Sequence, residues 1–111
     1  MSVSPIIDTH AHLDMSAYDD DREDMLARAA AAGVVNMITV GTDLESSKRA
    51  VELADRYPNV YAAVGIHPHD VAAITLNDMD AIEKVVMNPR AVAVGETGLD
   101  FYRDICPQDR Q

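Results

Sequence analysis

The sequence predicts an α/β fold in which about four parallel β-strands alternate with helices. Short apolar runs that are closed by glycine or polar residues alternate with stretches whose apolar residues follow the helical period. The centres of the apolar runs, near Ile7, Ile38, Ala62 and Ala93, recur at roughly thirty residues, the length of one β-α unit. Strands joined by such units lie parallel and are connected by right-handed crossovers. Residues 1–111 contain no low-complexity segment or linker, so we expect one continuous α/β domain.

Each predicted strand is short and mostly apolar, as expected for a strand that is buried on both faces of a sheet. The strands are expected at residues 5–7, 36–41, 60–65 and 91–95. Helices are expected at residues 21–32, 42–57 and 78–87. Gly33 suits the end of the first helix, and Thr42 with Glu45 resembles a capping box that opens the second. Pro107 is expected to open a fourth helix, because proline suits the first helical turn.

The bulk composition narrows the possible partners. The chain has 19 Asp and Glu against 9 Lys and Arg, so its formal net charge is −10. This balance argues against a broad basic surface for nucleic acid, although bound metal ions could supply positive charge for a phosphate substrate. The single cysteine, Cys106, excludes an internal disulfide and a thiolate metal cage. No apolar run approaches the roughly eighteen residues of a membrane-spanning helix, so we expect no membrane partner and a cytoplasmic location.

Polar residues gather where the predicted strands end. These polar clusters are residues 8–12, 41–43, 65–69 and 95–100, and two of them contain all four histidines of the chain. The carboxyl ends of parallel strands form one face of an α/β fold, and active sites are built on that face. The four clusters therefore predict one shared site.

His10 and His12 are the first candidate metal ligands. They lie two residues apart at the end of an extended segment, so both rings are expected on the same side. Two converging imidazoles suit zinc or a similar first-row ion. A His-x-His pair also arises by chance, as two unrelated polar residues in a loop. Its position after a buried strand, with Asp8 near enough to orient a ring, favours the metal site.

Glu96 is the third candidate ligand. It directly follows an apolar run, where a carboxylate must be paired, hydrogen-bonded or metal-bound. Its two oxygens could bridge two cations, as two-metal hydrolytic sites require. The alternative is a structural ion pair with Arg90 or Arg103.

The remaining polar residues are candidates for substrate binding. His67 and His69 flank Pro68 and could form a second ligand pair. We prefer a substrate-side role for His67, at a phosphate, and place His69 further out, where a structural role is nearly as well supported. Asp100 and Arg103 are expected to brace the site or to meet substrate charge.

Three segments, in order, resemble the signatures of the TatD family in the amidohydrolase superfamily. They are Ile7–Leu13, Val64–His69 and Gly95–Tyr102, where Thr97 stands at a position that is usually aliphatic. The resemblance covers essentially the whole chain. It implies the N-terminal half of a (β/α)8 TIM-type barrel, with about four parallel β-α units. Residues 1–111 would then be the N-terminal portion of a single TatD-type metal-dependent hydrolase domain, whose C-terminal half is absent.

The resemblance also implies a chemistry. His10 and His12 would bind one divalent ion, and Glu96, the catalytic carboxylate, would bridge it to a second ion; zinc, manganese, magnesium or similar ions would serve. The two metals would activate water to cleave phosphodiester bonds of DNA, as in a deoxyribonuclease. In the family, two further histidines and an aspartate come from later strands, and this sequence has no histidine after His69. The isolated chain is therefore expected to be inactive or weak, and to self-associate through open sheet edges.

Other functions remain open at this point. An amidohydrolase-type enzyme acting on an ester, lactone or amide would use similar metals. PHP phosphoesterases also begin with a His-x-His motif, but membership of that class would not explain the polar cluster at residues 95–100. A polypeptide that ended at Gln111 would be a non-catalytic, truncated metal-binding module. A flavodoxin-like sheet would leave His-x-His and Glu96 unexplained.

Overall fold

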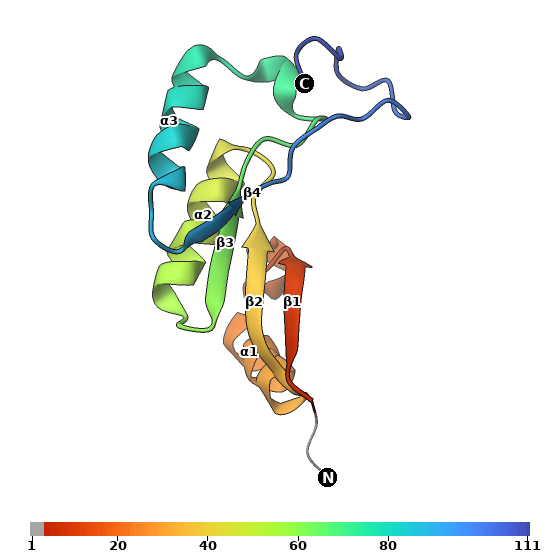
Figure 1. The fold of residues 1–111 in the computed structure, drawn as a ribbon. Helices are drawn as coiled ribbons and strands as arrows, with labels where there is room; N and C mark the ends of the chain where they lie inside the picture. The colour runs from red at the N-terminus through yellow and green to blue at the C-terminus, as the bar shows by residue number, and fades with distance from the viewer. Residues whose placement is uncertain (1–3) are drawn as a thin grey trace.

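The computed structural model describes residues 4–111 and shows a four-stranded parallel sheet in the order β1-β2-β3-β4 (Figure 1). The strands are β1 (Ile6–Ala11), β2 (Val34–Val40), β3 (Val60–Val64) and β4 (Ala91–Val94). The helices are α1 (Arg22–Ala31), α2 (Leu44–Arg56) and α3 (Leu76–Val86), with short 3-10 turns η1 (Ser16–Tyr18) and η2 (Val71–Ala73). The predicted α/β fold of four parallel strands alternating with helices is confirmed.

The middle of the sheet carries the core. The side chains of β2 and β3 pack against α2, and α3 packs beside α2 along the same flank of the sheet (Figure 1). The buried cluster includes Ala50, Val51 and Ala54 of α2 and Val60 and Val64 of β3. By contrast, the two outer strands are largely exposed along their lengths. Within residues 4–111, no helix combines the length and the apolar character that crossing a bilayer requires.

The predicted capping box of α2 is wrong by one residue. The N-cap is Asp43, whose carboxylate accepts the backbone N–H of Ser46 at 2.7 Å, while the Ser46 hydroxyl accepts the backbone N–H of Asp43. Asp43 and Ser46 therefore have the two roles that the sequence predicts for Thr42 and Glu45. The short Ser46 side chain can accept the N-cap N–H as well as a longer Glu side chain can. Burial would raise the pKa of Asp43, but the hydrogen bonds from Ser46 and the nearby Arg49 hold it below its usual value.

The other helix ends also differ slightly from expectation. Helix α3 begins at Leu76, two residues early, because Thr75 is the N-cap and forms a second capping box with Asp78. The hydrogen bonds from Thr75 lower the pKa of Asp78. After Pro107 there is one turn, in which the N–H groups of Arg110 and Gln111 donate to the Pro107 carbonyl. The predicted fourth helix is therefore not formed within the described residues.

Two glycines let the strand ends approach their neighbours. A Cβ on Gly41 would lie 2.3 Å from the Ser47 hydroxyl, and a Cβ on Gly65 would lie 2.9 Å from the Glu96 carbonyl oxygen. The buried Ser47 hydroxyl donates to the Gly65 carbonyl and accepts the Gly65 N–H. The start of α2, the end of β3 and the residue after β4 are thus held together at the carboxyl edge of the sheet, where the polar clusters lie.

Candidate metal centre

Glu96 is held at this edge by the backbone of the two central strands. Its N–H donates to the Gly41 carbonyl at 2.9 Å, and the preceding Gly95 N–H donates to Val64 at 3.0 Å. Nearby, the His67 N–H donates to the Thr42 carbonyl at 2.7 Å. The segments that follow β2, β3 and β4 therefore converge, as predicted for the polar clusters.

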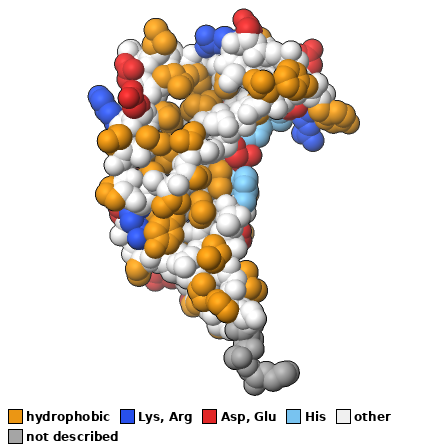
Figure 2. Space-filling view, viewed as in Figure 1, with side chains coloured by type: hydrophobic (Ala, Val, Ile, Leu, Met, Phe, Trp, Pro, Cys, Tyr) orange, Lys and Arg blue, Asp and Glu red, His pale blue; other side chains and the backbone are white. Residues whose placement is uncertain are grey.

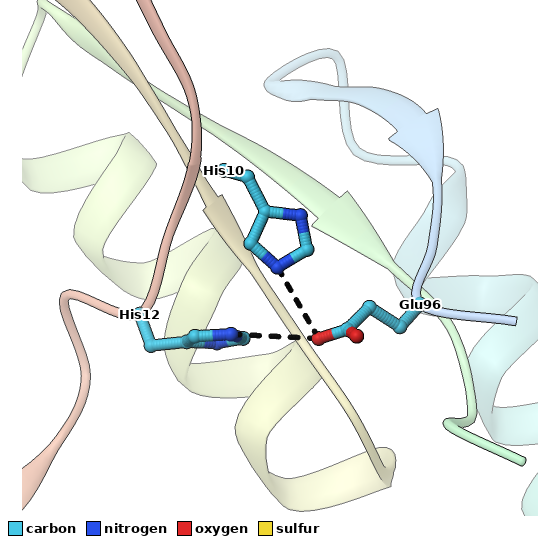
Figure 3. Close-up of side chains that lie close together, drawn as sticks. All are labelled: His10, His12 and Glu96. Carbon is cyan, nitrogen blue, oxygen red and sulfur yellow. Dashed lines mark ion pairs between the residues drawn. The ribbon is translucent and has the colours of Figure 1, made fainter.

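His10 and His12 converge on the Glu96 side chain (Figure 3). The Nε2 atoms of both histidines lie 3.4 Å from the same oxygen, Oε2. The two rings meet edge to face, with their centroids 5.1 Å apart. The predicted placement of both rings on one side of the strand end is confirmed. The three residues can each offer one ligand atom with all three atoms within 4.8 Å of one another, the dimension of a metal-binding group.

The hydrogen bonding of His12 indicates that a cation fits between these side chains. His12 Nδ1 lies 2.9 Å from the Val40 carbonyl, an acceptor only, so Nδ1 carries the proton. In the neutral ring, Nε2 then presents a lone pair toward the Glu96 carboxylate, which also only accepts. Two acceptors at 3.4 Å repel each other unless a proton or a metal ion lies between them. A histidine held at Nδ1 by a carbonyl is the usual arrangement of a metal ligand.

Asp8 does not have the predicted role of orienting a ring. Its carboxylate accepts the backbone N–H of His10 at 3.0 Å. The ring of His12 is instead oriented by the Val40 carbonyl, which reaches it from the neighbouring strand. The exit of the chain from β1 is further held by the buried Thr39 hydroxyl, which accepts the Leu13 N–H at 3.1 Å.

The alternative ion pair between Glu96 and Arg90 is wrong. Arg90 donates to carbonyl groups of Ala54, Tyr57, Pro58 and Val60, and its guanidinium lies 4.2 Å from the centre of the Tyr61 ring. It thereby caps the end of α2 far from the carboxyl edge of the sheet. Arg103 is exposed, and its backbone N–H donates to Asp100.

His67 faces the other oxygen of Glu96. Its Nε2 atom lies 3.5 Å from Oε1, while its Nδ1 accepts the backbone N–H of His69 at 3.0 Å. Since Nδ1 is an acceptor, the proton of the neutral ring is on Nε2, and His67 points a donor into the site. This orientation opposes a ligand role for Nδ1 and agrees with the predicted substrate-side role, which stays a prediction.

His69 and Asp100 form a separate pair behind this histidine. His69 Nε2 and Asp100 Oδ2 are 2.5 Å apart, and the ring centroids of His67 and His69 are 4.4 Å apart. The backbone N–H of Arg103 and the ring of His69 lower the pKa of Asp100 to about 2, so its carboxylate is ionised. The pair joins the segments that follow β3 and β4, and the bracing role expected for Asp100 stays a prediction.

Comparisons with known proteins show the family and the fold of this chain. The sequence model of the family described as "TatD related DNase" matches residues 7–111. The chain belongs to the TatD family, as its three signature segments predicted. A solved structure described as a TatD homologue, YJJV from Escherichia coli K12, has 37% sequence identity and a TM-score of 0.81, covering 89% of this chain and 39% of that one. A TatD family hydrolase from Entamoeba histolytica, at 22% identity, supports the fold alone with a TM-score of 0.85 over 99% of this chain and 43% of that one.

Curated relatives carry names that describe an activity. A Bacillus subtilis (strain 168) protein named "Uncharacterized metal-dependent hydrolase YabD" is 40% identical over 106 residues, 96% of this chain and 42% of that protein. A Salmonella typhimurium protein named "3'-5' ssDNA/RNA exonuclease TatD" is 40% identical over 107 residues, 96% of this chain and 41% of that protein. The chain thus spans about two-fifths of the length of these relatives.

Proposed function

We propose that this chain supplies one part of the active site of a metal-dependent hydrolase that cleaves phosphodiester bonds of DNA. Residues 1–111 would be the N-terminal portion of that single hydrolase domain. The observation that carries the proposal is the group of three ligand atoms from His10, His12 and Glu96, all within 4.8 Å of one another, in which His12 Nε2 and Glu96 Oε2 face each other as acceptors. The name of the Salmonella relative, which describes an exonuclease of single-stranded DNA and RNA, supports a nucleic acid as substrate.

The two oxygens of Glu96 face different neighbours, which suits a bridging carboxylate. Oε2 lies beside His10 and His12, which would hold the first divalent ion, while Oε1 lies on the side of His67, where a second ion would be reached. When bound, two divalent ions polarise a phosphoryl oxygen and activate water for attack. Their charge would also offset part of the net charge of −10 that otherwise repels a polyanion.

His67 and Arg103 would act on the substrate. The Nε2–H of His67 is held in its tautomer by the His69 backbone and can donate to a phosphate oxygen without changing its protonation. Arg103 is exposed at the same edge and would contribute a bidentate phosphate contact. Asp100 and His69 would position these groups without touching the reacting atoms.

Titration calorimetry with Mn²⁺ on the metal-free 111-residue chain tests the metal centre. We expect binding, and we expect Glu96→Gln to weaken it at least about tenfold, because a ligand oxygen loses its charge. The matched control is Glu45→Gln, since Glu45 is exposed on the first turn of α2 with 72% of its side chain accessible. A chain that binds neither Mn²⁺ nor Zn²⁺, or equal binding by the two variants, would contradict the proposal.

Turnover with Mn²⁺ tests the substrate class. We expect slow hydrolysis of bis(p-nitrophenyl) phosphate that is lost in Glu96→Gln, with slow rates because the chain spans about two-fifths of its relatives. Hydrolysis of p-nitrophenyl acetate or a lactone in place of the phosphodiester would point instead to an amidohydrolase of another substrate class. Metal binding without turnover of any of these compounds would leave a non-catalytic metal-binding module.

A further inference from the structure

The segment after Glu96 carries a set of exposed hydrophobic side chains that the metal centre does not use. We call residues 99–105 the aromatic loop. Phe101 is 70% exposed and Tyr102 is 93% exposed, and Leu99 and Ile105 are also more than half exposed. The loop extends outward from the carboxyl edge of the sheet (Figure 1), and a space-filling view shows hydrophobic and basic side chains at its outer end with histidines on the adjacent surface (Figure 2). Exposed rings of this kind are a feature of binding surfaces.

The aromatic loop is a braced turn. One oxygen of the Asp100 carboxylate accepts the backbone N–H groups of Tyr102 and Arg103, at 2.9 and 3.0 Å. The side chain of Gln111 accepts the Asp100 N–H and donates to the Asp100 carbonyl. The backbone below the two rings is therefore held from both sides, although the rings themselves are open to solvent. A ring on a fixed turn loses little conformational freedom when a flat ligand covers it.

A continuous set of contacts joins the loop to the metal centre. The second Asp100 oxygen bonds the His69 ring, the His69 backbone bonds the His67 ring, and His67 faces Glu96. The aromatic loop is therefore fixed relative to the metal centre through His69 and His67. Arg103, the next residue after Tyr102 in the same turn, is exposed and adds a positive charge to the loop.

We propose that Phe101 and Tyr102 form a stacking platform for bases of a single-stranded nucleic acid whose phosphodiester lies at the metal centre, with Arg103 at a neighbouring phosphate. This inference rests on the proposed function and extends it to the part of the substrate that is not cleaved. Bases are flat and uncharged, so they can cover the rings without bringing more negative charge to a chain of net charge −10. Stacking on aromatic rings accepts any base, so the platform would bind single strands without reading their sequence.

Fluorescence anisotropy with a labelled oligothymidylate and an abasic oligonucleotide of equal length tests the platform. The buffer contains Mn²⁺ and binding is read before any hydrolysis, so that the phosphodiester can lie at the metal centre and the metal contributes equally to every variant. We expect Phe101→Leu and Tyr102→Leu to weaken oligothymidylate binding about fivefold to a hundredfold, the range per stacked base, and to leave abasic binding unchanged. Leu76→Ala, at a side chain that is 85% exposed on α3, is the control and should bind both oligonucleotides as the unaltered chain does.

A second measurement uses the intrinsic fluorescence of the chain. The sequence contains four tyrosines and no tryptophan, so tyrosine emission is directly observable. Oligothymidylate should quench this emission, and Tyr102→Leu should remove a large part of the quenching. Equal binding of thymidylate and abasic strands by the unaltered chain, or unchanged thymidylate binding in both aromatic variants, would overturn the platform.

The platform and the proposed function fail in different ways. Tyr102→Leu should bind Mn²⁺ as the unaltered chain does, because its ring is not a ligand. Loss of base-dependent binding with intact Mn²⁺ binding would overturn the platform alone. Absence of Mn²⁺ binding with base-dependent stacking intact would remove the metal centre and leave a single-strand binding surface.

Discussion

The inner and outer strands of the sheet are built from the same kinds of residue but have very different surroundings. Val60 and Val64 of β3 are 0% exposed, whereas Ile7 of β1 is 57% exposed and Val94 of β4 is 70% exposed. The inner unit, β2-α2-β3, holds most of the buried core. The side chains of the candidate metal centre, by contrast, come from β1 and from the residues that follow β1 and β4. The chemistry therefore sits on the least buried strands and is positioned by the backbone of the most buried ones.

Truncation of one valine in each region should give the largest difference in stability. Val64→Ala removes two methyl groups from a closed core, and we expect it to lower the free energy of unfolding by about 2–3 kcal/mol. Val94→Ala removes the same atoms from an exposed strand and should cost less than about 0.5 kcal/mol. Urea unfolding followed by circular dichroism measures both values. Equal costs would show that β4 is covered in solution, and would break the comparison.

The exposed outer strands predict self-association of the isolated chain. Open strand edges with apolar side chains pair readily with a second copy, and a lysine in such a strand opposes this. We expect Val94→Lys to raise the dissociation constant of the self-associated state about tenfold, equivalent to about 1.4 kcal/mol. Sedimentation velocity over a range of micromolar concentrations measures this. The control is Leu76→Lys on α3, and a monomeric unaltered chain at all concentrations would contradict the prediction.

The two capping boxes allow a smaller and sharper test. Asp43→Ala and Thr75→Ala remove the same type of N-cap from α2 and from α3, at a typical cost of about 1 kcal/mol. Asp43→Ala should lower the free energy of unfolding more than Thr75→Ala. Loss of Asp43 also releases Ser46, which is buried against the strand ends, whereas the Thr75 capping box is exposed. Thermal unfolding of both variants measures the difference. A larger effect at Thr75 would place the more cooperative part of the fold at α3.

The smallest expected effect is the pH dependence that Asp100 adds. Hydrogen bonds to its ionised form hold the pKa at about 2, below the ordinary value near 4, so the unfolded chain takes up the proton first as the pH falls. The stabilisation is thus fully present above about pH 4 and is lost as the pH falls toward 2. Asp100→Asn should show a shallower loss of stability between about pH 5 and pH 2 in urea unfolding. An identical pH profile for both chains would contradict this.

Much of this architecture could be predicted from residue patterns. The approximate positions of the four strands and three helices follow from the spacing of the hydrophobic residues. The convergence of the polar clusters follows because the carboxyl ends of parallel strands lie at one edge of the sheet. Two errors are local: the capping box of α2 is shifted by one residue, and the turn after Pro107 is not a helix. The expected burial of every strand on both faces is wrong for the outer strands β1 and β4, which are largely exposed. Several short polar side chains can cap the same helix start, so the sequence near Thr42 allows more than one solution.

The sequence by itself determined the β-α alternation, the pairing of His10 with His12 and the presence of a carboxylate at Glu96, because these depend on side-chain type and on spacing along one strand. The tertiary structure alone decided which groups orient them. His12 and Glu96 are held by the backbone carbonyls of Val40 and Gly41. Because every residue has a backbone carbonyl, no side-chain pattern in the sequence indicates which carbonyls have this role. Their role comes from the register between neighbouring strands, which brings together groups that are distant along the chain.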